Sequence, residues 1–149
     1  MSKAQLLREL ADAFEQLIVT ATEAAQLGVT RDGATWGPRE IVAHLAGWEI
    51  MATVRVPRIA AGMAPFEEAD ETRQAVMDEA LNATMVTLVG DQALASLCGI
   101  LRQAYRQDIA MLEGLDDSHF QPGAYVYERT RGVIEHCQEH GQHLGSGPA

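Results

Sequence analysis

The chain has 149 residues, of which 47% are hydrophobic and 21% charged, so we expect residues 1–149 to form a single globular domain. Its 21 acidic and 11 basic residues give a formal net charge of -10, the wrong sign for a nucleic-acid-binding surface, so we exclude DNA and RNA as partners. No apolar run approaches a membrane span, the N-terminus lacks the apolar centre of a signal peptide, and two cysteines make no disulfide framework, so we expect a cytoplasmic protein with no membrane partner.

The first half of the chain predicts two helices. Apolar residues at helical spacing run from the N-cap candidate Ser2 to a stop at Gly28, and residues 28–37 are rich in Gly, Thr and Asp, as a connection would be. A second helix starts at Pro38, where a missing N–H does no harm. Its buried stripe, with His44 on the flank and pointing inward, consists of Ile41, Leu45, Trp48 and Ala52.

The second half predicts further helices and one loop. Pro57 should end or kink the second helix near Val56, although the pattern can resume to Gly62. Residues 71–115 read as helical with one break, where Asp91 can cap the second part. Residues 116–128 carry turn residues and read as a loop over one end of the fold. With few aromatics and no strand alternation, we expect an all-α fold, a bundle of four main helices with this loop or a short helical segment as an extra element.

The last predicted helix, Gly132 to Leu144, holds three of the five histidines. At about 100° per residue, His136 and His140 share an apolar face with Val133, and spacing i, i+4 lets two ring nitrogens bind one metal ion at about 2.0–2.1 Å. His143 lies near the edge of that face and is about 10 Å from His136 along the helix axis, so a useful site needs a third ligand from elsewhere. The alternative is that these histidines only complement the helix dipole, but an unpartnered buried imidazole carries a desolvation cost.

Two segments resemble the DinB/YfiT-like superfamily of metal-binding four-helix bundles. They are TWGPREIVAHLAGWE, residues 35–49, and IEHCQEHGQHL, residues 134–144. In that family a tryptophan and a proline precede the helix that carries the first histidine ligand, and an H-x-x-x-H motif on the last core helix supplies the other two. The resemblance therefore implies His44, His136 and His140 as the metal ligands. It covers nearly the whole chain, although the middle helices are generic.

What the resemblance implies is a divalent metal, zinc or nickel, with one coordination position left open. Members of the family include thiol-dependent transferases and isomerases that use bacillithiol or mycothiol, and a small-molecule hydrolase that confers self-resistance to a genotoxin. His143 has no ligand role in the family pattern, which leaves open whether it supports a ligand by a hydrogen bond, carries protons or lies at the surface. The expected partner is a small-molecule substrate, with a low-molecular-weight thiol as a possible cosubstrate, and a homodimer is left open.

The sequence does not choose between reaction types. Three neutral imidazoles leave the full positive charge on the metal, so a coordinated water or thiol would become a nucleophile at neutral pH, which suits a hydrolase or a transferase equally. A non-catalytic metal or small-molecule binder would need the same three histidines. A structural bundle whose histidines bind nothing is the third hypothesis.

Other residues near the motifs have less distinctive interpretations. The residues from His136 to His140 also spell H-x-x-E-H, the inverted zinc-peptidase motif, but Glu139 is turned away from the buried face and is expected at the surface. Cys137 is expected to be a small core residue. Trp48 follows His44 by one turn on the same side. Arg55 lies further along that side, where it could hold an anionic group but is more simply a solvated arginine.

Overall fold

The computed structural model describes residues 1–66, 68–89 and 91–145, and within them the fold is all-helical. Five α-helices and one short 3-10 helix follow one another in this part of the chain: α1 Lys3–Gln26, α2 Pro38–Ala60, α3 Glu71–Val89, α4 Leu94–Glu113, η1 Asp117–Phe120 and α5 Tyr125–Gly145. The same residues contain no strand, only an isolated bridge between Asp32 and Thr35. The expected helical bundle is therefore present.

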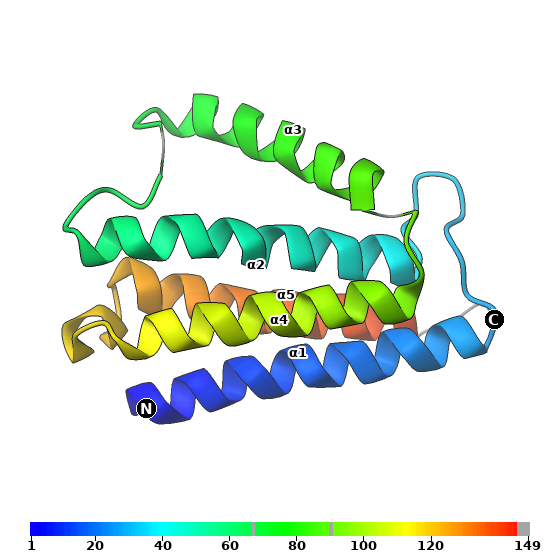
Figure 1. The fold of residues 1–149 in the computed structure, drawn as a ribbon, viewed down its shortest axis with the longest axis horizontal. Helices are drawn as coiled ribbons and strands as arrows, with labels where there is room; N and C mark the ends of the chain where they lie inside the picture. The colour runs from blue at the N-terminus through cyan, green and yellow to red at the C-terminus, as the bar shows by residue number, and fades with distance from the viewer. Residues whose placement is uncertain (67, 90, 146–149) are drawn as a thin grey trace.

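Four of the helices enclose the core and the fifth lies outside it. α2 packs on α4, and α1 packs on both α5 and α4. α3 lies against α2 on the side away from α1, as an outer layer (Figure 1). The residues that contribute the largest fully buried apolar side chains come from α1, α2, α4 and α5: Leu6, Leu10, Phe14, Leu17, Ile41, Val42, Leu97, Leu101, Leu112 and Val126. Burial of this much apolar surface stabilises the bundle without any ligand.

The helix starts follow from capping residues that the sequence offers. The Ser2 hydroxyl accepts a hydrogen bond from the Gln5 backbone N–H at 3.1 Å, which caps α1. At the start of α2, Pro38 occupies the first turn, and the Glu40 carboxylate accepts from the Gly37 N–H at 3.2 Å. α1 stops before Gly28, whose φ of 84° needs a residue without a Cβ.

The structure decides two of the expected boundaries. α2 continues past Pro57 to Ala60, as the resumed apolar pattern allowed, because a proline so close to the end removes one hydrogen bond while Ile59 still packs against the core. Asp91 does not cap α4, which begins only at Leu94.

None of the described helices is both long and apolar enough to cross a membrane.

The segment expected as a loop at residues 116–128 is largely helical. Its first part forms η1, and α5 already begins at Tyr125, well before the expected start at Gly132. The apolar face of α5 extends back to Val126, which is 2% exposed, and its burial favours a helix from Tyr125, whereas residues 121–124 do form a turn between η1 and α5. The Glu128 carboxylate accepts from the Gly123 N–H at 2.8 Å and so satisfies a donor next to the start of α5.

α3 approaches α2 closely at one point beside the histidine of α2. A Cβ at Gly47 would lie 2.3 Å from the Met85 sulfur, so this contact requires a glycine. The glycine brings the outer helix close enough for its polar side chains to reach those of α2.

Candidate metal centre

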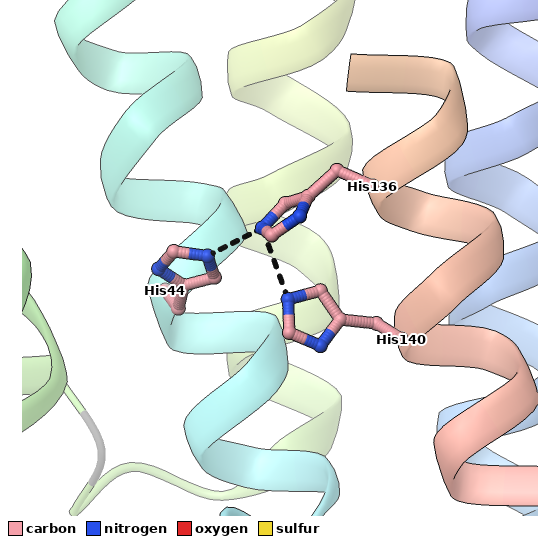
Figure 2. A group of neighbouring side chains, drawn as sticks. All are labelled: His44, His136 and His140. Atoms are coloured by element: carbon pink, nitrogen blue, oxygen red, sulfur yellow. Dashed lines mark hydrogen bonds between the residues drawn. The ribbon is translucent and has the colours of Figure 1, made fainter. Parts of the chain in front are cut away.

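Three histidines from two helices converge on one point. His44 extends from α2, and His136 and His140 extend from α5 one turn apart (Figure 2). The Nε2 atom of His136 lies 3.0 Å from that of His44 and 3.1 Å from that of His140. One ring nitrogen from each histidine lies within 4.8 Å of the others. The structure thus brings together the three residues that the family resemblance implied, and they could hold a metal ion.

The spacing of the nitrogens fits a small divalent ion. A tetrahedral ion with bonds of about 2.0–2.1 Å holds its ligand atoms about 3.3 Å apart. The separations of 3.0 and 3.1 Å are close to that value. Without an ion, three neutral imidazoles could not all be hydrogen-bonded to one another through Nε2, since each Nε2 either donates one proton or accepts one. An arrangement of converging lone pairs therefore suits a metal better than a hydrogen-bond network.

Asn82 of α3 fixes the tautomer of His44. The Asn82 Oδ1 atom accepts a hydrogen bond from the Trp48 indole Nε1–H at 3.2 Å, and because an indole N–H only donates, this contact identifies Oδ1 as the acceptor. The same oxygen is hydrogen-bonded to Nδ1 of His44, which must then carry the ring proton. The lone pair of His44 is left on Nε2, which faces the other two histidines. Such an outer hydrogen bond commonly orients a metal-binding histidine.

Burial keeps two of the imidazoles neutral. Burial lowers the pKa of His44, against the opposite effect of the Asn82 hydrogen bond. Burial also lowers the pKa of His140, to about 4, with a smaller effect from the neighbouring His136. A neutral imidazole has a lone pair to offer. The His136 side chain is 45% exposed, so the cluster is open to solvent on that side.

The other candidates on α5 lie outside the cluster. Glu139 is 76% exposed, as expected of a surface residue, with its Oε2 atom 3.9 Å from Nδ1 of His136, on the opposite edge of the ring from Nε2. His143 is exposed and is not one of the three converging histidines. Cys137 is buried in the core, as expected, and burial raises the pKa of its thiol to about 12. A thiol of that kind is neither a ready ligand nor a nucleophile.

A buried ionic network lies beside the histidines, and sequence reasoning missed it. Arg129 of α5 donates from Nη1 to Asp108 Oδ2 and from Nη2 to Glu49 Oε1, both at 2.8 Å. Glu49 is 1% exposed and Asp108 is not exposed at all. The signal available in the sequence was the position of Glu49, four residues after Leu45 on the buried stripe of α2.

Burial favours a proton on Glu49 within this network. Burial raises the pKa of Glu49 to about 8 against the lowering effect of Arg129, and Asp108 raises it further through its charge and a hydrogen bond. Glu49 Oε2 and Asp108 Oδ1 have no donor among the described residues. A proton on Glu49 that is donated to Asp108 satisfies both oxygens. At neutral pH the network is then one guanidinium balanced by one carboxylate.

A cavity of about 350 Å³ adjoins His136 and extends from it to Glu49 and Arg129 of this network. Its lining includes Leu45, Trp48 and Glu49 of α2 on one side, and Arg129, Val133 and His136 of α5 on the other. The volume lies within the range typical of small-molecule sites. The site therefore combines three converging ring nitrogens with space for a small molecule next to one of them.

Arg55 is not the solvated residue that we expected. Its side chain is 11% exposed, and Nη2 lies 3.1 Å from Asp78 Oδ1 of α3. The guanidinium also lies over the Trp48 ring, 5.5 Å from its centroid, and over the Phe66 ring at 5.3 Å. Because α3 packs over this part of α2, it covers Arg55 and removes it from water.

A scan of protein-family models and searches of curated proteins and solved structures return no match to this chain.

Proposed function

We propose that this protein is a metal-dependent enzyme of the DinB/YfiT-like type, which holds a divalent ion, zinc or nickel, through Nε2 of His44, His136 and His140. We further propose that it acts on a small molecule, as a transferase with a thiol cosubstrate or as a hydrolase. The observation that carries the proposal is the convergence of the three Nε2 atoms, with the tautomer of His44 fixed by Asn82.

Three features support a catalytic site over a closed structural one. The ligand set has three protein side chains, the number typical of catalytic zinc. The side chain of His136 is partly exposed, so a further ligand has access. The cavity next to it offers room for a substrate. A bound ion would supply the Lewis acidity that activates a water or a thiol at neutral pH.

The residues of this chain have their own parts in such a site. Asn82 holds the imidazole of His44 in place, and the cavity offers an apolar wall beside His136. The sequence motifs at residues 35–49 and 134–144 support the family assignment. A non-catalytic binder of metal or small molecules is the alternative, and it differs only in the absence of turnover.

Metal binding by variants of α5 tests the proposal. His140→Ala should abolish binding of Zn²⁺ or Co²⁺ to EDTA-treated protein, measured by calorimetry and by Co²⁺ absorption. His143→Ala is the matched control and should retain the metal, as should Glu139→Gln. EDTA should lower the melting temperature of the metal-loaded protein only modestly, because the bundle has its own core and the ion adds stability by mass action.

Two outcomes would contradict the proposal. One is wild-type protein that binds no divalent ion, and the other is a His143→Ala protein that loses the metal as completely as His140→Ala. Turnover of a thiol with an electrophile, or hydrolysis of an activated ester, then separates the enzyme from the non-catalytic binder. An inactive Glu139→Gln protein that retains its metal would instead favour the peptidase-like interpretation of H-x-x-E-H.

A further inference from the structure

The cavity beside His136 is polar at a few points, and the charged groups there are already paired. Arg55 and Asp78 form an ion pair at 3.1 Å, and Arg129 binds Glu49 and Asp108 at 2.8 Å each. Each arginine is thus paired with at least one carboxyl group. A charged ligand would find no unpaired opposite charge here and would give up part of its hydration against the cavity wall, which is costly.

The rest of the cavity wall is apolar. Aliphatic side chains from three helices line it: Leu45, Val56, Ile59, Leu112, Val126 and Val133. Two aromatic rings, those of Trp48 and Tyr125, also face it. Apolar surface of this kind favours a ligand that gives up little hydration on entry.

The lining of the cavity extends along α5 from Tyr125, past Arg129, to His136. Tyr125 and His136 are eleven residues apart on α5, which is about 16 Å at 1.5 Å per residue. A ligand that fills the cavity would have one end beside His136.

We propose that this cavity binds an uncharged, largely apolar small molecule, with its reacting group at the His136 end. The inference names the substrate class of the proposed enzyme and rests on that function only for the ligand being a substrate. Binding itself needs the cavity and not the ion. Arg55 therefore does not hold an anionic group of the ligand.

Gly132 offers a way to obstruct the cavity without damaging the fold. It is part of the lining, and a Cβ at this position would meet nothing within 4 Å. Gly132 is exposed and lies at the rim of the cavity, so Gly132→Leu should fold, with a gain in helix propensity, while its larger side chain narrows the entrance. Gly99→Leu is the matched control, because Gly99 is an exposed glycine of α4 where a Cβ also meets nothing within 4 Å.

The test measures binding of indole to the full chain in EDTA, by calorimetry and by the NMR shift of the Trp48 indole N–H. Indole should bind wild type and the Gly99→Leu control equally, and Gly132→Leu at least about 10-fold more weakly. Indole-3-acetate and tryptamine, which carry opposite charges on the same ring system, should each bind wild type at least about 10-fold more weakly than indole, about 1.4 kcal/mol.

Failure of indole to bind, equal binding by Gly132→Leu, or tighter binding of either charged analogue would overturn the inference. Preference for indole-3-acetate would show that an arginine is available to an anion. Preference for tryptamine would show that the carboxyl groups carry more negative charge than a shared proton allows. Because no metal is present in this assay, its outcome is independent of whether the histidines bind an ion.

Discussion

Glu49→Gln should remove a pH dependence of stability that the buried network imposes on the wild-type protein. The folded-state pKa of Glu49, about 8, lies above its ordinary value of 4.5. Between those values the native state holds a proton that the unfolded state does not. The stability from this group is thus fully present below the lower value and is lost as the pH rises through about 8. A glutamine resembles protonated glutamate, since its amide can donate to Asp108 and its oxygen can accept from Arg129.

The magnitude follows from the linkage of one proton. One proton of difference changes the free energy of unfolding by about 1.36 kcal/mol per pH unit. The range from pH 5 to pH 7 lies between the two pKa values of 4.5 and about 8. Over this range the titration of Glu49 should lower the free energy of unfolding of the wild type by about 3 kcal/mol. Glu49 is 1% exposed, so little of this effect is screened by solvent.

Urea unfolding at pH 5, 6, 7 and 8 in EDTA provides the measurement, with the difference between variant and wild type as the quantity of interest. The Glu49→Gln protein should become more stable relative to wild type by about 3 kcal/mol between pH 5 and 7. Glu15→Gln is the control. The hydrogen bond from Arg102 is the largest cause that lowers the pKa of Glu15. The contribution of Glu15 to the free energy of unfolding is therefore lost only as the pH falls below about 4.5. Parallel pH profiles for Glu49→Gln and wild type would refute the shared proton.

Two further predictions concern the residues around the site. Arg129→Met should lower the free energy of unfolding by about 3–5 kcal/mol, because it leaves two buried carboxyl groups unpaired. Arg102→Met breaks a part-exposed pair and should lower it by about 1 kcal/mol or less, so equal losses in urea unfolding would contradict the buried pairing. Asn82→Leu should keep the fold but weaken Zn²⁺ binding about 10- to 100-fold by freeing the His44 tautomer, and an unchanged Kd in calorimetric titration would exclude that role.

The sequence determined the parts of this protein that depend on local spacing. Apolar periodicity predicted the helices and the buried stripe of α2, and i, i+4 spacing placed His136 and His140 on one side of the last helix. Residues that usually end helices or form turns predicted the helix boundaries less reliably. Pro57 suggested an end or a kink near Val56, with a possible continuation, and α2 continues to Ala60; residues 125–128 were expected in a loop and belong to α5. Propensity is a small energy per residue, and tertiary packing outweighs it.

Only the tertiary structure decided which distant side chains meet. Spacing along one helix could not place His44, 92 residues from His136, within 3.0 Å of it; that contact follows from how α2 and α5 face each other. Asn82 reaches His44 because Gly47 lets α3 approach α2 closely. Arg55 is largely shielded from solvent because α3 packs over it. The Glu49, Asp108 and Arg129 network joins three helices that share no local pattern. Such contacts depend on packing between segments, which a single sequence does not encode in any periodicity.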